Sequence, residues 1–394
     1  MPWKESCAMD ERMRFIAARL TGLHTMIELC EASGISRKTG YKWWDRYQAE
    51  GAAGLEERSH APHRPGHVTP AAIAERIIAL RQAHPSWGPC KIIGFLHNQS
   101  AGIAWPAPST AGEILKRAGL VTARRQRRRA PPRLDELCVV QEPNHVWGVD
   151  HKGWIRLRNG WRCEPLTITD TFSRYLIAVA ATGSTGTAEA RPVFERAFRE
   201  HGLPDVLRSD NGAPFAAASA SGLTALSVWW AKLGIGHERI DPGKPQQNGR
   251  HERFHRTLLE AMQPPCADQA AQERRFEAFR AEYNEQRPHE ALGQKPPASF
   301  YQPSPRPLPE RLPEPDYPAD AEVRRVRSTG EIKWRGEFVW IGEPLAGEWI
   351  CLNETEAGDW QVRFYNAPVG IIDRATNQLQ SMKPNHKAER RKYQ

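Results

Sequence analysis

The sequence predicts a multidomain chain with α-helical units at its N-terminus, a central α/β core and a small β-barrel at its C-terminus. Apolar residues recur at helical spacing in the N-terminal third. Between residues 141 and 295, three apolar β-rich runs precede an alternation of helix, strand, helix, strand and helix. Three antiparallel strands followed by that alternation are typical of a ribonuclease-H-like fold. With 394 residues the chain is long enough for several such domains.

Residues 1–58 are predicted to form a helix-turn-helix domain. Three helices are expected, at residues 11–20, 25–32 and 37–49. Thr25 and Ser36 are good N-caps, and Gly34 permits the tight turn between the last two helices. A third helix with a basic start is typical of units that read the major groove of DNA, although a generic three-helix bundle is the alternative. The residues expected at bases and phosphates are Arg37, Lys38, Thr39 and Lys42.

A second helical region is expected at 68–122, either as another DNA-binding unit or as an inert spacer. A basic linker follows at 123–140, where six arginines lie within ten residues and the net charge of the whole chain is +9. Such a run favours a segment that tracks phosphates, with a solvated linker as the alternative. The arginines expected to contact DNA here are Arg124, Arg125, Arg127, Arg128 and Arg129.

The C-terminal part is predicted from prolines and from alternating residues. Nine prolines between Pro296 and Pro318 indicate an extended linker at 296–320. Short alternating runs with Gly-containing turns then indicate a small β domain at 321–380, with an SH3-like barrel as the expected form. The seven cysteines form no C-x-x-C pair, and no run of about 18 apolar residues occurs. We therefore expect a cytoplasmic protein with neither a disulfide framework nor a membrane span.

Three acidic residues in the predicted core, 141–295, indicate a metal site. The segment D-V-L-R-S-D-N-G-A-P-F is expected to be a strand that delivers Asp210 into an Asn-Gly turn. The segment P-G-K-P-Q-Q-N-G-R-H-E-R-F-H-R-T-L-L-E is expected to be a loop and then a helix that carries Glu252. Asp150 lies in the first strand, and in a ribonuclease-H-like sheet the first and fourth strands are neighbours. Hard carboxylate ligands suit Mg²⁺ or Mn²⁺, and two such ions could serve phosphoryl transfer.

A competing pattern overlaps Glu252. His251, Glu252 and His255 satisfy H-E-x-x-H, in which two histidines bind zinc and the glutamate acts as base of a metalloprotease. The pattern is short and often arises by chance. Arg250, Arg253 and Arg256 surround the histidines, which favours a helix that lies along a phosphate backbone over a protease helix.

The combined motifs resemble those of a known family. Asp150, the R-S-D-N-G around Asp210, and the P-Q-Q-N-G-R-H-E-R-F-H-R-T-L around Glu252 are similar to the signatures of integrase-like DDE transposases of bacterial insertion sequences, relatives of retroviral integrases. The closing Y-N-x-x-R-P-H that ends at His289 extends the resemblance. It implies that Asp150, Asp210 and Glu252 are the catalytic, metal-binding triad. The Asp210 to Glu252 separation is longer than usual in that family, and we assign the extra length to the loop at 216–223.

The resemblance implies a DNA transposase of the bacterial nucleoid. Such a protein binds terminal inverted repeats, nicks the 3′ ends and joins them to target DNA, and it acts as a homo-oligomer because two ends react together. Residues of the core expected to contact DNA are Asn211, Lys244, Gln247, Asn248, Arg250 and Arg253. The alternatives are a DNA-binding regulator with an inactive core and a structure-specific nuclease without strand transfer.

Overall fold

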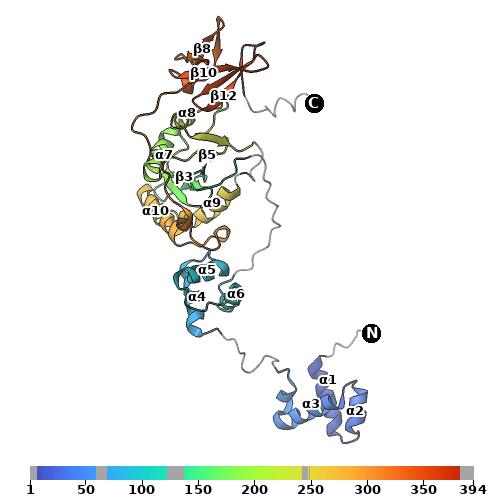
Figure 1. The fold of residues 1–394 in the computed structure, drawn as a ribbon. Helices are drawn as coiled ribbons and strands as arrows, with labels where there is room; N and C mark the ends of the chain where they lie inside the picture. The colour runs from blue at the N-terminus through green and yellow to red at the C-terminus, as the bar shows by residue number, and fades with distance from the viewer. Residues whose placement is uncertain (1–6, 59–68, 122–136, 242–246, 248, 382–394) are drawn as a thin grey trace. The chain divides into compact units, whose positions relative to one another are not determined.

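A computed structural model describes residues 7–58, 69–121, 137–241, 247 and 249–381 (Figure 1). The chain divides into two compact units, Met1–Pro70 and Ala71–Gln394, which are described separately. In the described ranges, every helix is too short or too polar to cross a lipid bilayer.

The N-terminal unit is a three-helix bundle around a small apolar core. Its helices are α1 (Ala8–Leu20), α2 (Met26–Ala32) and α3 (Arg37–Glu50), followed by the short helix η1 (Gly51–Leu55). The side chains of Thr25 and Ser36 accept hydrogen bonds from backbone N–H groups in the first turns of α2 and α3, so both predicted N-caps are confirmed. Gly34 in the turn has φ of 64°, a conformation that favours glycine.

Helix α3 approaches α2 closely because the residue of α3 that faces Cys30 is a glycine, Gly40. A Cβ atom at Gly40 would lie 2.4 Å from the sulfur of Cys30, so no larger residue fits without displacing the helix. Trp43, one turn further, is buried in the core of the bundle. The guanidinium of Arg12 lies 3.9 Å from the centre of the Trp43 ring and covers it from the solvent side.

The second unit begins with three helices that dock on the α/β core. They are α4 (Ala71–Ala83), α5 (Pro89–Gln99) and α6 (Pro108–Arg117). Trp87 and Ile92 lie at the centre of their own apolar cluster. The amide of Asn98 donates to the carbonyl of Gln294 at 2.8 Å, and Gly94 of α5 packs against the Gln294 side chain. This region is therefore anchored to the segment that follows the core.

The α/β core is a mixed sheet between two layers of helices (Figure 1). Its strands are β1 (Val146–His151), β2 (Ile155–Arg156), β3 (Arg162–Asp170), β4 (Leu176–Thr182), β5 (Val206–Ser209) and β6 (Gly236–Arg239). The sheet order is β2-β3-β1-β5-β6, with β4 paired to β3. β3 pairs antiparallel with β1 and β4, whereas β1, β5 and β6 run parallel. The first and fourth strands of the predicted order, β1 and β5, are indeed neighbours.

Helices cover both faces of this sheet. They are α7 (Thr187–His201), α8 (Ala225–Lys232), α9 (Gly249–Met262) and α10 (Gln269–Glu285). Phe194, Phe198 and Trp230 of α7 and α8 pack with β1, β3 and β5 in one apolar cluster. Phe254 and Phe276 of α9 and α10 pack on the opposite side in another. Because both faces are covered, β4 is largely apolar, and every residue of β3 after Arg162 is buried.

The proline-rich segment is bound to the core along part of its length. After the short helices η3 (Glu290–Leu292) and η4 (Pro297–Phe300), the chain runs without helix or strand as far as residue 321. Leu203 donates its backbone N–H to the carbonyl of Arg306 at 2.7 Å. The Arg306 guanidinium bonds in turn to Asp205, at 2.8 Å, and to three backbone carbonyls. The predicted linker at 296–320 thus contains the short helix η4 and is anchored to the core at Arg306.

The C-terminal domain is an open sheet with a separate hairpin, and the predicted barrel is not confirmed. Its strands are β7 (Glu322–Arg325), β8 (Glu331–Trp334), β9 (Glu337–Trp340), β10 (Trp349–Glu354), β11 (Trp360–Phe364), β12 (Ala367–Ile372) and β13 (Leu379–Gln380), with the short helix η5 (Glu343–Leu345) before β10. Five strands pair in the order β13-β12-β11-β10-β7, while β8 pairs with β9. Among the described strands, none closes the sheet on itself. The hairpin and two residues of α8, Val228 and Ala231, supply the apolar cover that closure would otherwise provide.

Asn284, at the end of α10, binds the outer edge of β4. Its buried side chain accepts a hydrogen bond from Leu176 N–H at 2.8 Å and donates one to the Leu176 carbonyl at 3.0 Å. It thus acts as a one-residue substitute for a further strand. Asn284 is the asparagine of the Y-N-x-x-R-P-H motif, so this part of the motif has a structural role.

We predict that Asn284→Ala lowers the free energy of unfolding of the core by about 2–4 kcal/mol, because two buried backbone groups lose their partners. Urea unfolding measures the loss, and hydrogen exchange at Leu176 localises it. Gln286→Ala, at the exposed C-cap position directly after α10, is the control. Equal stability of the Asn284→Ala and Gln286→Ala variants would contradict this role.

Candidate active site

Asp150 lies on β1, and Asp210 directly follows β5, the parallel neighbour of β1. β1 pairs with β5 through Val146 with Val206, Trp147 with Leu207 and Gly148 with Arg208, an offset of 60 residues. Asp150 and Asp210 continue that offset. Asp150 near the end of β1 and Asp210 just after β5 therefore lie at the same end of the strand pair.

A turn orients Asp210 directly after β5. Its Oδ1 accepts a hydrogen bond from the backbone N–H of Gly212 at 3.0 Å, the local pattern that favours aspartate at the start of a turn. Asn211 was predicted to contact DNA. Its side-chain amide instead donates to the carbonyl of Ile240 at 2.6 Å, which ties the turn to the end of β6.

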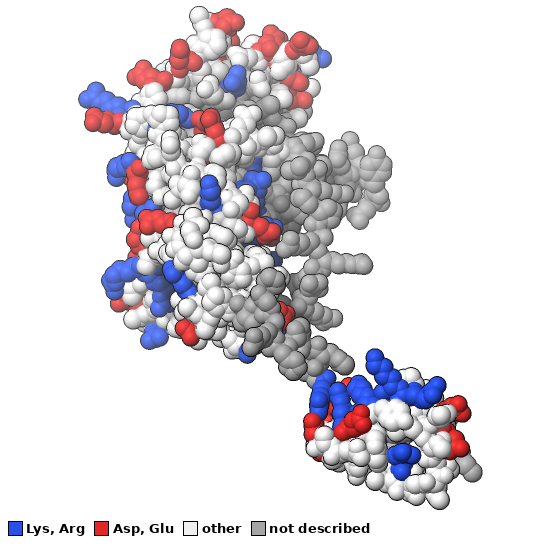
Figure 2. All heavy atoms as spheres, turned by 60° about the horizontal axis from the view of Figure 1, so that its bottom comes forward, with Lys and Arg blue, Asp and Glu red and all other residues white. Residues whose placement is uncertain are grey.

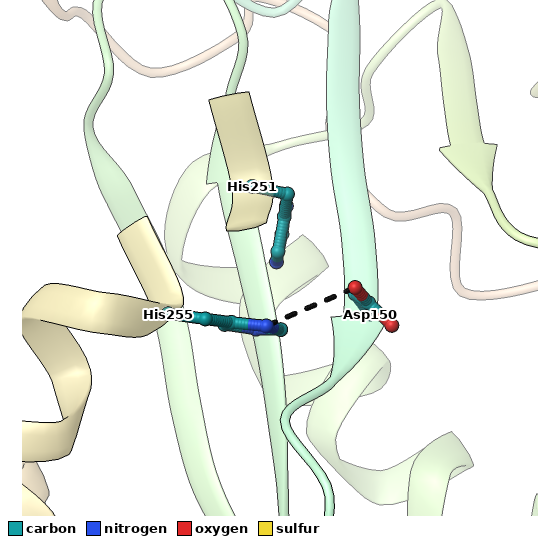
Figure 3. Close-up of side chains that lie close together, drawn as sticks. All are labelled: Asp150, His251 and His255. Carbon is teal, nitrogen blue, oxygen red and sulfur yellow. Dashed lines mark ion pairs between the residues drawn. The ribbon is translucent and has the colours of Figure 1, made fainter. Parts of the chain in front are cut away.

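Helix α9 divides the predicted site residues between two faces. Glu252 and Arg253 are exposed, whereas His251, Phe254 and His255 are buried against the sheet. Figure 3 shows both histidines pointing from α9 toward Asp150 of β1. The ligand atoms of Asp150, His251 and His255 lie within 4.8 Å of one another. In the described part of the chain the three predicted acids do not form such a group, so their joint role as metal ligands stays a prediction.

The hydroxyl of Thr167 on β3 connects the two histidines to the strand that carries Asp150. Thr167 Oγ1 lies 2.7 Å from His251 Nε2, 2.9 Å from His255 Nε2 and 2.9 Å from the carbonyl oxygen of Asp150. Thr169 Oγ1 lies 3.3 Å from the other ring nitrogen of His251, Nδ1. Two side chains of α9 are therefore bound to β3 through one buried hydroxyl.

Burial keeps both imidazoles neutral. It lowers the pKa of His251 to about 3, and it lowers the pKa of His255 to about 2, with a further contribution from His251. His255 Nδ1 lies 3.8 Å from Asp150 Oδ2. This contact is marked as an ion pair in Figure 3, but with so low a pKa His255 carries no charge near neutral pH.

The sequence interpretation of the two histidines needs correction. They were set aside because arginines surround them along the chain. On the helix, however, His251, Phe254, His255 and Leu258 recur at intervals of three and four residues and share the buried face. That spacing was visible in the sequence and could have placed the histidines beside the sheet.

A basic hollow lies beside His251. It is lined by Arg174, Arg208 and Arg250, with Gln247 at its margin. Burial and the nearby charge of Arg250 lower the pKa of Arg174 to about 10, so its guanidinium remains charged near neutral pH. Gln247 exchanges two hydrogen bonds with Asp241, at 2.7 and 3.0 Å.

The predicted DNA-contacting residues of the N-terminal unit lie largely on its surface. Arg37, Lys38 and Lys42 of α3 are exposed, while Thr39 is half-buried and bonds to the Ser36 hydroxyl at 2.9 Å. Figure 2 shows lysine and arginine side chains gathered along one edge of this unit. The following predicted residues lie outside the described part of the chain: Arg124, Arg125, Arg127, Arg128, Arg129, Lys244 and Asn248.

Family models match the chain in its core and in its N-terminal part. Two integrase core domain models match residues 140–245 and 233–297, the segments that hold the acids and α9. The chain belongs to the integrase superfamily, with the transposases of bacterial insertion sequences. A helix-turn-helix domain model matches residues 11–65, and a homeodomain-like domain model matches residues 39–115. The predicted helix-turn-helix unit and integrase core are thereby confirmed.

The relatives of this integrase-superfamily chain include insertion-element proteins. The uncharacterized 31.7 kDa protein of insertion element IS407 from Burkholderia multivorans is 32% identical over 48% of the chain. The uncharacterized 39.2 kDa protein of IS476 from Xanthomonas euvesicatoria is 29% identical over 59% of the chain. Each match spans 66% of the relative's own length. The catalytic core domain of HTLV-2 integrase in complex with magnesium is 17% identical, covering 41% of the chain and 98% of that core, with a TM-score of 0.31.

We predict that Thr167→Val lowers the free energy of unfolding by about 3 kcal/mol, because three buried polar groups lose a shared partner while the side-chain shape is kept. The matched control is Thr169→Val, which removes a single bond of 3.3 Å and should cost about 1 kcal/mol. Urea unfolding compares the two variants. If Thr167→Val is no more destabilising than Thr169→Val, the shared hydroxyl does not hold α9 on the sheet.

Proposed function

We propose that the chain is a DNA transposase that binds the ends of its element, nicks them and joins the 3′ ends to target DNA. The observation that supports the proposal is that Asp150 and Asp210 lie at the same end of the parallel β1–β5 pair, within segments that match integrase core models. The full activity, including strand transfer, rests on this placement and on the kinship with insertion-element proteins.

Asp150, Asp210 and Glu252 would hold Mg²⁺ or Mn²⁺, with two ions in the complete site. The donor set fits, because carboxylate oxygens are the ligands these hard ions prefer. When bound, the ions supply charge stabilisation and an activated water or 3′-hydroxyl for in-line phosphoryl transfer. The chain itself would hold Asp150 on β1 and Asp210 directly after β5, and it would present Glu252 on the first turns of α9.

DNA would be held by charged groups on both units. Arg37, Lys38 and Lys42 of α3 suit the major groove and phosphates of the terminal inverted repeats. In the core, Arg250 belongs to the basic hollow and Arg253 to the exposed face of α9, where both suit phosphates of the end or of target DNA. Because two ends must react together, the active form would be a homo-oligomer on DNA, at the bacterial nucleoid.

We predict that Asp210→Asn abolishes nicking and joining while leaving end binding intact. The expected loss is about a thousandfold, because metal-dependent charge stabilisation worth several kcal/mol disappears. The assay uses oligonucleotides with the inverted repeats that flank the gene, in Mg²⁺ or Mn²⁺. Asp268→Asn is the matched control, since asparagine also caps a helix and Asp268 only caps α10.

Two results of that assay would replace the proposal. A wild-type chain that binds end DNA as well as Asp210→Asn but neither nicks nor joins it would be a DNA-binding regulator. A chain that nicks branched or end DNA but never joins it would be a structure-specific nuclease.

A second prediction concerns the helix-turn-helix unit. Changing Arg37 and Lys38 together to alanine should weaken end binding and lower the slope of log affinity against log salt by about 2, one for each lost phosphate contact. Arg14→Ala on α1, an exposed arginine paired with Glu11, is the control and should change the slope far less. Equal effects of the two changes would exclude α3 as the DNA-facing helix.

A further inference from the structure

One contact at the candidate site is too long for a hydrogen bond and lies within a group of possible metal ligands. It joins Nδ1 of His255 to Oδ2 of Asp150 across 3.8 Å. The imidazole is buried and the carboxylate side chain is 18% exposed, so one partner is fixed in the protein and the other reaches solvent. Whether His255 Nδ1 presents a hydrogen or a lone pair to Asp150 follows from the hydrogen bonds of Thr167, His251 and His255.

The hydrogen-bond pattern assigns these hydrogens. The single hydrogen of the Thr167 hydroxyl points to the Asp150 carbonyl oxygen, because that oxygen can only accept. Thr167 Oγ1 must then accept from both histidines, so the neutral rings of His251 and His255 each carry their hydrogen on Nε2. His255 Nδ1 is left with a lone pair, and that lone pair faces the Asp150 carboxylate.

His251 differs from His255 in one respect. Its Nδ1 lies 3.3 Å from the Thr169 hydroxyl, which can donate to it. Both ring nitrogens of His251 therefore have partners on β3. Of the two imidazoles, His255 is the one that presents a nitrogen to Asp150.

A divalent cation fits between the nitrogen of His255 and the oxygen of Asp150. Two electron-pair donors repel unless a proton or a cation lies between them. Both atoms belong to a group of side chains, Asp150, His251 and His255, whose ligand atoms lie within 4.8 Å of one another. Nε2 of His255 is bound to Thr167, so Nδ1 is the ring nitrogen that remains for a metal ion. Bonds from a metal ion to imidazole nitrogen and to carboxylate oxygen are each about 2.1 Å long, so one ion can span 3.8 Å.

We propose that His255 Nδ1 is a further ligand of the divalent ion held by Asp150, and that this nitrogen makes the site favour a first-row transition ion such as Mn²⁺ over Mg²⁺. The proposal builds on the metal site of the proposed function and adds a nitrogen to its carboxylates. Mg²⁺ is bound almost entirely through oxygen, whereas imidazole stabilises transition ions.

The test measures metal binding on the full chain without a histidine tag. Mn²⁺ is the probe, and pulsed electron paramagnetic resonance detects the nitrogen of a directly bound imidazole. We expect this nitrogen signal in the wild type and in His251→Asn, the matched control, and its loss in His255→Asn. Mn²⁺ affinity should fall by at least about tenfold in His255→Asn, as even outer-shell losses commonly cost about 10- to 100-fold. Mg²⁺ affinity should change little.

Three results would overturn the proposal: no Mn²⁺ binding that depends on Asp150, no nitrogen signal in the wild type, or an unchanged signal in His255→Asn. If His255→Asn does not fold, ¹⁵N-histidine labelling of the wild type replaces it, and a signal that keeps its ¹⁴N character excludes histidine as the source. The outcome is separate from that of the Asp210→Asn assay. A chain that joins DNA ends in Mg²⁺ without any nitrogen signal keeps its proposed function and loses this ligand.

Discussion

The parallel pairing of β1 with β5 is the contact on which the candidate site depends. It brings together two segments 60 residues apart, so that Asp150 on β1 and Asp210 just after β5 lie at the same end of the strand pair. β1 can hold this position because β3 pairs with its other edge and apolar helices cover both faces. A shift of the β1–β5 register would therefore change the distance between the two acids.

The second constraint is that the two faces of α9 have different roles. Its inner face is bound to β3 by Thr167 and packed through Phe254 and Leu258, while its outer face carries Glu252 and Arg253. The inner face thus fixes the helix relative to Asp150. The outer face keeps charged groups available to solvent and to DNA. A single helix can in this way belong both to the apolar core and to the surface that reacts.

Much of the fold could be predicted because its signals are local. Apolar spacing and the caps Thr25 and Ser36 predicted the N-terminal helices, and β-rich runs predicted the strand that carries Asp150. Long-range pairing is less visible. The predicted barrel is not confirmed. Alternation of residues indicates strands, but it does not show whether the last strand pairs with the first, and here β8 and β9 form a hairpin separate from the five-stranded sheet.

The candidate site was predictable to a similar degree. The pairing of β1, which carries Asp150, with β5, which precedes Asp210, agrees with the expected order of strands. The role of Thr167 was not predictable, because a threonine within an apolar strand gives no sign of the two histidines that approach it from a helix 84 and 88 residues further on. Neither could the sequence reveal that Asn211 is held by Ile240, since that bond depends on where β6 ends.

Helix α8 has a consequence for how members of such a family can exchange parts. Its Leu226, Trp229 and Trp230 belong to the core of the α/β unit, whereas Val228 and Ala231 belong to the core of the C-terminal sheet. Lys232 adds an ion pair with Glu348. Recombination in the proline-rich segment would therefore separate two halves of one apolar core. The α/β unit and the C-terminal sheet are therefore expected to be exchanged together, as one unit.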